Sequence, residues 1–235
     1  MKSTGWAWIL GICIIIAASV FGFFYFGANM RGETVRVVGY ATRDFEADIA
    51  KWSFTLSVST GMNDLASGYR RLEKQAQSFR DAWEAQGIAA DEVSFQPVST
   101  NKQYNRDGNE IGYTVQQRVD IVSQDLDALD ALVQRPTVFI EAGVPFEYSR
   151  IEYYSTDIAD LKKALLGDAT ADARDRAERI VEGSGRGIAK LLSARSGIFQ
   201  ITERLSTEVS DYGMYNTASR SKTIKVTVTA EFGLE

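Results

Sequence analysis

Strict alternation of apolar and polar residues predicts two half-buried β-strands, one near residues 50–58 and one at residues 222–233. The apolar positions are Ala50, Trp52, Phe54, Leu56 and Val58 in the first strand, and Ile224, Val226, Val228, Ala230 and Phe232 in the second. Further strands are expected at 35–40, 93–104, 111–122 and 197–205, with an extended segment at 137–154. The Asp-Gly turn signal within 105–109 joins 93–104 and 111–122 as a hairpin.

Apolar residues at steps of three and four predict helices at about 63–86, 125–133 and 157–182. The first stripe contains Leu65, Tyr69, Leu72, Ala76, Phe79 and Trp83, and the long C-terminal stripe contains Ile158, Leu161, Leu165, Ala169, Ala173, Ala177 and Ile180. Gly87 is a natural stop for the first helix. The three alanines in the last stripe permit close approach to a sheet or to another helix.

The order of these elements predicts an α+β fold made of two β-α-β-β units, with pseudo-repeat halves at about 35–123 and 137–235. In each unit, helices pack on antiparallel strands. Because a sheet covered on one face leaves apolar surface for a second layer, the units are expected to pack within a chain, between chains, or both.

Residues 5–28 contain no charged side chain and are long enough to cross a hydrocarbon core about 30 Å thick as a helix. We therefore expect a transmembrane anchor at 1–30 and a folded body at 31–235. A cleaved signal peptide is the alternative. It is disfavoured because Phe26 or Tyr25 would occupy a position where signal peptidase prefers a small residue.

Lys2 and the amino terminus favour a cytoplasmic N-terminus and a periplasmic body, in a protein that crosses the inner membrane once. Arg31 and Arg36, on the far side of the apolar segment, count against this orientation. The bilayer is thus an expected partner, through residues 5–28.

Composition narrows the possible chemistry. The chain has no histidine, and Cys13, inside the apolar segment, is its only cysteine. Metal sites built from histidine and cysteine, Ser-His or Cys-His nucleophilic pairs and disulfides within the body are excluded. A formal net charge of −5 disfavours nucleic acid as a partner. No cofactor and no metal site is predicted.

Three polar segments are candidates for a site, and each has a structural reading that we favour. Asp44, Glu46 and Asp48 could bind a cation or act in acid-base chemistry, but the segment 42–48 is more simply a solvated corner between two strands. The acidic run 125–130 resembles a calcium loop but lacks its glycine and glutamate, so helix capping explains it better. The glycine-rich 183–187 closes a helix instead of opening one, unlike a phosphate-binding loop. The short basic stretch 219–222 is expected to be solvated. No catalytic, cofactor-binding or metal-binding residue is therefore assigned.

Three stretches carry a resemblance to a known family. They are "VRVVGYATRDFEADIAKWSFTLSVST" at 35–60, the Ala/Arg/Glu-rich helix with its glycine-rich exit at 171–203, and the closing segment at 208–234. In this order and spacing the chain resembles the SIMPL-domain family over about Val35 to Leu234. The usual proline of the family's corner is absent, and Phe45 and Glu46 stand in that region.

The resemblance implies a bacterial envelope protein, typically periplasmic, with some relatives associated with oxidative-stress defence. It also implies assembly, since a related immunogenic protein forms a ring-like, channel-shaped homo-oligomer. No catalytic residue of the family can be carried over to this chain.

The first hypothesis is therefore a non-enzymatic, membrane-anchored scaffold that forms a homo-oligomeric ring or cage and supports envelope or oxidative-stress tolerance indirectly. Two alternatives stay open. One is an envelope enzyme or ligand-binding protein that uses carboxylates, and the other is an adaptor for other envelope proteins.

Overall fold

The computed structural model describes residues 4–29, 33–86, 90–208 and 210–235. Within these ranges it has an N-terminal apolar helix, four further α-helices and two five-stranded sheets, so the predicted α+β class is confirmed. The helices are α1 (Thr4–Asn29), α2 (Leu65–Glu84), α3 (Leu126–Gln134), α4 (Thr137–Glu141) and α5 (Ile158–Glu182), with a short 3₁₀ turn η1 (Ala90–Glu92). The strands are β1 (Thr34–Glu46), β2 (Ile49–Gly61), β3 (Val93–Phe95), β4 (Ser99–Tyr104), β5 (Glu110–Ser123), β6 (Phe146–Tyr154), β7 (Ile188–Ser196), β8 (Gln200–Glu203), β9 (Met214–Tyr215) and β10 (Ser221–Leu234).

The chain divides into two compact units, each made of segments distant in sequence. Unit 1 comprises 1–41, 166–197 and 226–235, and unit 2 comprises 42–165 and 198–225. Strands β1 and β10 and helix α5 each contribute residues to both units. This division does not test the predicted pseudo-repeat with halves at 35–123 and 137–235, so the repeat stays a prediction.

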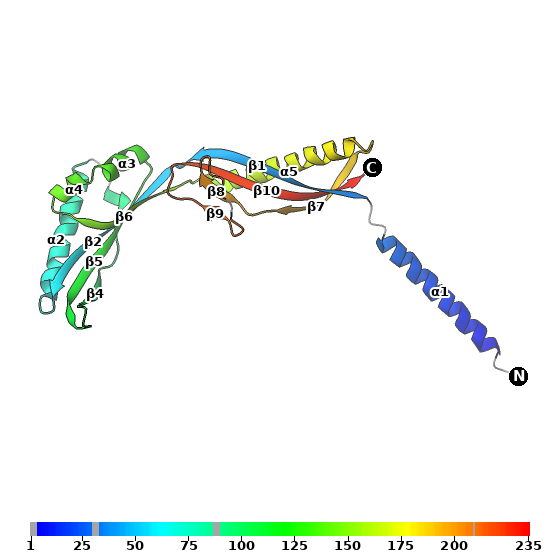
Figure 1. Cartoon of the computed structure of the whole chain (residues 1–235), viewed down its shortest axis with the longest axis horizontal. Helices are drawn as coiled ribbons and strands as arrows, with labels where there is room; N and C mark the ends of the chain where they lie inside the picture. Colours follow the sequence, from blue (N-terminus) through cyan, green and yellow to red (C-terminus); the bar gives the residue numbers. More distant parts are fainter. Residues whose placement is uncertain (1–3, 30–32, 87–89, 209) are drawn as a thin grey trace. The chain divides into compact units, whose positions relative to one another are not determined.

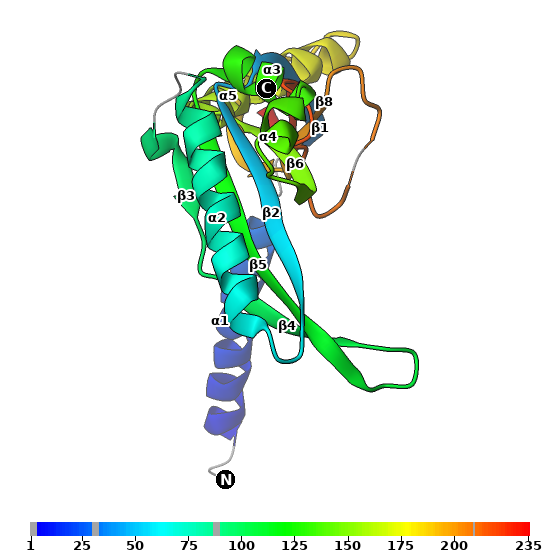
Figure 2. The same ribbon diagram turned by 90° about the vertical axis from the view of Figure 1, so that its left-hand side faces the viewer.

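One sheet, in unit 2, has β2 between β5 and β6, with β3 and β4 both pairing with β5. All these pairs are antiparallel, and β2 and β5 stay in register from Ala50 opposite Ser123 to Gly61 opposite Gly112. Helix α2 lies along β2 and β5 in Figure 2. The hairpin predicted around 105–109 is confirmed as β4–β5, with Gly108 at a positive φ of 81°.

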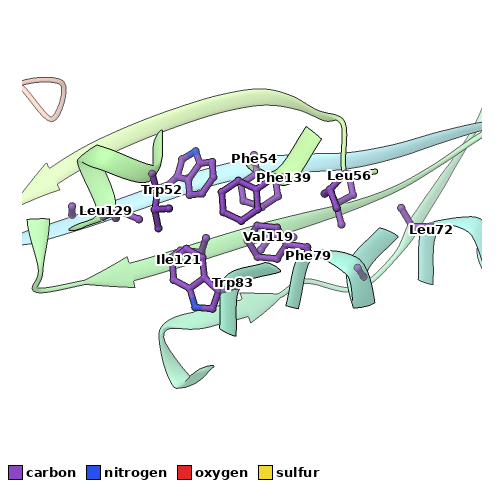
Figure 3. Packing of buried hydrophobic residues seen from close by; sticks show 14 of the residues in the cluster. Trp52, Phe54, Leu56, Leu72, Phe79, Trp83, Val119, Ile121, Leu129 and Phe139 are labelled. Atoms are coloured by element: carbon purple, nitrogen blue, oxygen red, sulfur yellow. The ribbon is translucent and has the colours of Figure 1, made fainter. Parts of the chain in front are cut away.

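The core of unit 2 is aromatic. Trp52 and Phe54 of β2 meet Phe79 of α2 and Phe139 of α4, as Figure 3 shows. The ring centroids of Phe79 lie 5.0 Å from those of both Phe54 and Phe139. The predicted stripe of α2 is confirmed at Leu72, Ala76, Phe79 and Trp83, all of which are buried. Gly87, the predicted helix stop, lies outside the described residues.

In unit 1, helix α5 runs along the strands β1, β10 and β7 (Figure 1). Gly39 of β1 lies so close to the helix that a Cβ atom there would be 2.2 Å from the carbonyl oxygen of Ala169 and 2.4 Å from the amide nitrogen of Ala173. Both alanines are fully buried. The close approach expected from the alanine stripe is therefore confirmed, and the partner is a strand.

Two local predictions were wrong, and one strand was missed. The segment 137–154 is not extended throughout, because residues 137–141 form α4, which places Phe139 in the core. The segment 42–48 is not a corner: β1 continues to Glu46, and the break before β2 is limited to Ala47 and Asp48. Strand β7, at 188–196, was not predicted at all.

Candidate functional site

The carboxylates of Asp44 and Glu46 pair with the neighbouring strand β10 instead of forming a site. Asp44 accepts a hydrogen bond of 2.6 Å from the Thr223 hydroxyl, and its other oxygen lies 3.3 Å from Nε of Arg204. Glu46 accepts a hydrogen bond of 2.6 Å from the Ser221 hydroxyl. These are cross-strand contacts at the surface of a sheet, and they give both carboxylates a structural role.

Asp48 instead bonds to the residue Thr156, which follows β6. One of its oxygens accepts a 2.9 Å hydrogen bond from the backbone N–H of Thr156, and the other accepts one from the Thr156 hydroxyl. Partial desolvation acts to raise the pKa of Asp48, but these hydrogen bonds together outweigh it and hold the pKa below its usual value. The predicted trio of carboxylates therefore does not converge on one point.

The acidic run 125–130 positions helix α3, as the capping interpretation predicted. Asp125 is the N-cap and accepts a 3.0 Å hydrogen bond from the backbone N–H of Ala128. Asp127 lies 2.5 Å from Nη1 of Arg220, and Asp130 accepts a 2.6 Å hydrogen bond from the Tyr153 hydroxyl. Burial, followed by this bond to Asp130, raises the pKa of Tyr153 to about 12. Among the described residues, no group of three or more Asp, Glu, His or Cys side chains could hold a metal ion.

The glycine-rich 183–187 ends helix α5, as predicted, with Gly185 in the left-handed region at φ 71°. The basic stretch 219–222, in contrast, is not wholly solvated, because the Lys222 side chain is fully buried. Its ammonium donates a 2.7 Å hydrogen bond to the backbone carbonyl of Asn216, and burial lowers its pKa to about 8. Lys222 therefore fastens the segment before β10 from inside unit 2.

A polar network on the sheet face opposite α2 was missed by the sequence reasoning. Its centre is the Asp120 carboxylate of β5, which is only 9% exposed and accepts a 2.6 Å hydrogen bond from Ser53 of β2. Arg118 adds a 3.0 Å bond from Nε to the same oxygen, and Gln96 donates a 3.3 Å bond to the other. Lys51 lies 3.7 Å away. Burial acts to raise the pKa of Asp120, but the bonds from Ser53 and Arg118 and the two nearby cations lower it overall.

A second set of polar contacts lies beside this network, on β6. Arg150, opposite Ser53 in the register, lies 3.1 Å from a Glu152 oxygen that also accepts a 3.1 Å hydrogen bond from Thr217. The alternation of β2 predicted that Lys51 and Ser53 share one face. No signal in the sequence predicted which residues of β5 and β6 lie beside them, because that depends on strand register.

The two outer edges of the unit 1 sheet differ. On β1, the outward N–H of Tyr40 donates a 2.8 Å hydrogen bond to Asp172 of α5, and the Arg176 guanidinium lies 4.7 Å from the centre of the Tyr40 ring. Among the described residues, β7 pairs only with β10, and most of the strand is exposed. Leu191 and Leu192 are 44% and 48% exposed. We call residues 188–196 the β7 edge; it is the less protected of the two.

Helix α1 is long and apolar enough to cross a membrane, with an 18-residue window from Trp8 to Tyr25 of which no residue is buried. A single-pass anchor and a signal sequence both satisfy this criterion. Of the charged residues used for orientation, Lys2 and Arg31 lie outside the described residues, and Arg36 lies in β1.

With the fold and these sites established, comparison with known families is informative. The model of the SIMPL family, described as a protein of unknown function (DUF541), matches residues 35–232. The chain therefore belongs to the SIMPL family, as the resemblance predicted. Membership suggests an envelope-type protein. A comparison with curated proteins found no match.

Proposed function

We propose that the chain is a membrane-anchored envelope protein whose body, residues 31–235, lies in the periplasm and assembles with copies of itself into a ring or cage. It works as a scaffold and not as an enzyme. Any contribution to oxidative-stress tolerance is indirect. The observation that carries the proposal is the combination of one apolar N-terminal helix with a long, exposed strand edge on the folded body.

Retention of the helix is supported by the residues at its C-terminal end. Signal peptidase prefers small residues at the −3 and −1 positions, whereas Tyr25 and Phe26 are bulky. Helix α1 continues to Asn29 without a break in the described chain. A retained helix keeps every copy in the plane of one membrane, which favours encounters between bodies.

Self-association is supported by the β7 edge. An exposed strand edge offers unpaired backbone groups to another strand, and proteins usually protect such edges. The β1 edge is covered at Tyr40 by Asp172. The β7 edge has Lys190 and Arg195 as charges against pairing, but it exposes Leu191 and Leu192 between them. A second copy is the partner that every chain in the membrane finds beside it.

A structural role for the candidate acidic residues is supported by their contacts. Asp44, Glu46 and Asp48 each bond to serine, threonine or arginine side chains of a neighbouring segment. These bonds hold strands together and leave the three carboxylates at separate places. The only cysteine, Cys13, lies in α1 and not in the body.

Fractionation tests the anchor. The full chain should stay with inner membranes after alkaline carbonate washing, and added protease should digest the body in spheroplasts but not in intact cells. Recovery of the body in the soluble periplasmic fraction, starting beyond Ala28, would contradict the retained anchor.

A charge placed on the β7 edge tests self-association. Leu192→Lys should shift the detergent-extracted full chain to smaller species in light scattering, because an edge lysine in a new strand pair would be desolvated. Ile111→Lys is the matched control, since Ile111 is 52% exposed on β5 of unit 2. Equal particle masses for the wild type and both variants would count against the β7 edge as the contact.

Peroxide assays test the indirect role. The purified protein should decompose hydrogen peroxide no faster than buffer with matched trace metals. Turnover at an enzymatic rate would refute a non-enzymatic scaffold.

A further inference from the structure

The polar sheet face of unit 2 contains a small cavity of about 170 Å³. Its lining includes Ser53 and Thr55 of β2, Arg118 of β5, and Tyr148, Arg150 and Glu152 of β6. It lies on the opposite face of the sheet from the aromatic core, since Ser53 and Thr55 alternate with the buried Trp52 and Phe54. Two guanidinium groups from strands on either side of β2 therefore border one hollow.

Both arginines are held in place before any ligand arrives. Arg118 bonds through Nε to Asp120 at 3.0 Å and through Nη2 to the Ser53 hydroxyl at 3.2 Å. Arg150 is held through Nη2 by Glu152. Among the described contacts, Nη1 of both arginines is left for a ligand. A guanidinium whose orientation is already fixed loses less side-chain entropy when it binds a carboxylate or phosphate.

The carboxylates of this face are mostly engaged by the protein. Asp120 is 9% exposed and is bonded by Ser53, Arg118 and Gln96. Glu152 is bonded by Arg150 and Thr217. Glu147, opposite Thr55 in the register, is exposed and does not line the cavity. The unused hydrogen-bonding capacity at the cavity is thus mainly that of donors.

One wall of the cavity has an unusual backbone. The register of β6 against β2 is interrupted between Ser53 and Thr55, and in this bulge Tyr148 adopts a φ of 54° with its side chain 82% exposed. A bulky residue in the left-handed region is uncommon and strained. The bulge is fastened from the core side, where the Trp52 indole N–H donates a 2.9 Å hydrogen bond to the Ser149 hydroxyl. Bulges of this kind re-aim side chains beside functional sites.

The size of the cavity selects the ligand. Pockets for drug-sized molecules measure roughly 300–1,000 Å³, so 170 Å³ suits a compact molecule of few heavy atoms. The donors left at the cavity are the two arginines, the Thr55 hydroxyl and the Tyr148 phenol, because the Ser53 hydroxyl already donates to Asp120. Such a set matches the oxygens of a small anion.

We propose that this cavity binds a small soluble oxyanion, a phosphate or a short carboxylate, between Arg118 and Arg150, with Tyr148 at its rim. The proposal does not depend on the self-association proposed above, because all of its residues belong to unit 2 of one chain.

The test is a titration of the full chain in detergent with inorganic phosphate and, separately, with succinate, at constant ionic strength adjusted with sodium chloride. Calorimetry should give saturable binding of at least one of the two anions, with a dissociation constant near 1 mM, an affinity expected for an open site of two charged donors. Binding of phosphate would identify the ligand as a phosphate, and binding of succinate would identify it as a carboxylate.

Arg150→Gln should weaken this binding at least about tenfold, the effect of losing one charged hydrogen-bonding group. Arg174→Gln, on α5 in unit 1, removes the same charge outside both the cavity and the β7 edge and should leave the affinity unchanged. Circular dichroism of both variants should match the wild type. No saturable binding of either anion, or equal binding by the wild type and Arg150→Gln, would overturn the proposal, whatever the oligomeric state.

Discussion

The two units of the body are stabilised in opposite ways. Unit 2 buries large rings, with Trp52, Phe54 and Phe79 at its centre. Unit 1 buries mainly small residues: its cluster holds three alanines, Ala173, Ala177 and Ala230, with Val37 and a single ring, Phe232. In the first, stability comes from apolar area removed from water; in the second, it depends on a helix lying close against a strand. Unit 2 should therefore be destabilised most by substitutions that remove side-chain volume, and unit 1 by substitutions that add it.

The largest effect is expected from emptying the aromatic core. Phe79→Ala should lower the free energy of unfolding by about 4 kcal/mol, because Phe79 is fully buried and the rings around it cannot close the space. Thermal unfolding of the full chain in mild detergent measures this. Tyr212→Ala is the control: Tyr212 is 96% exposed, and its loss should cost under about 0.5 kcal/mol. Similar shifts for both variants would show that the aromatic cluster is not the core.

A single added methyl group tests the close approach in unit 1. Gly39→Ala should cost about 3 kcal/mol, since the new Cβ would meet backbone atoms of α5 at 2.2–2.8 Å. Gly167→Ala, in α5 itself, should instead raise the free energy of unfolding by about 0.5–1 kcal/mol. No atom lies within 4 Å of the added Cβ, and alanine favours the helix more than glycine does. If both changes have the same sign, the contrast between the units is wrong.

Lys222 is a fully buried cation in unit 2 and makes the stability of the unit depend on pH. Its pKa of about 8 in the folded protein lies below the ordinary value of 10.5. Between these values the unfolded chain binds more protons, so the free energy of unfolding should rise with pH, by at most about 1.4 kcal/mol per unit. Below pH 8 both states are protonated and this gain is absent.

Urea unfolding from pH 8 to pH 10 tests this dependence, and Lys222→Met should flatten it. Tyr153 does not interfere in this window. Its pKa rises from the ordinary value of 10.0 to about 12 in the folded protein, so its contribution to the free energy of unfolding falls only above pH 10. An equal slope in the wild type and in Lys222→Met would show that the lysine is not the source.

The smallest effects on the free energy of unfolding are expected from substitutions of the acidic residues that were candidates for a site. Asp125→Ala should cost about 1 kcal/mol by removing the N-cap of α3. Asp44→Ala should cost less, about 0.5 kcal/mol, because its partners are half exposed. Chemical denaturation of both variants ranks them; a larger loss for Asp44→Ala would mean that β1 depends on the carboxylate more than its exposure implies.

The strongly patterned elements could be predicted from the sequence, and the exposed ones could not. Strand β2 and helix α2 alternate or repeat because one face of each is buried. Strand β7 has no such pattern, since most of its residues are exposed on both faces. Helix α4 was missed because β-branched residues such as Thr137 and Val138 favour strands, whereas burial of Phe139 decides the local structure.

The candidate sites show the same limit. Capping by Asp125 follows from neighbours in sequence and was predicted. The bond of Ser53 to Asp120 and the place of Arg150 beside Ser53 involve three strands and depend on their register, including the bulge at Tyr148. A single sequence carries no signal for that register.

The most direct test of the account is electron microscopy of the detergent-extracted full chain. Anchored self-assembly predicts closed particles of many copies, each with its apolar helices gathered in a detergent belt. A field of single chains, at concentrations matching those in the membrane, would contradict it.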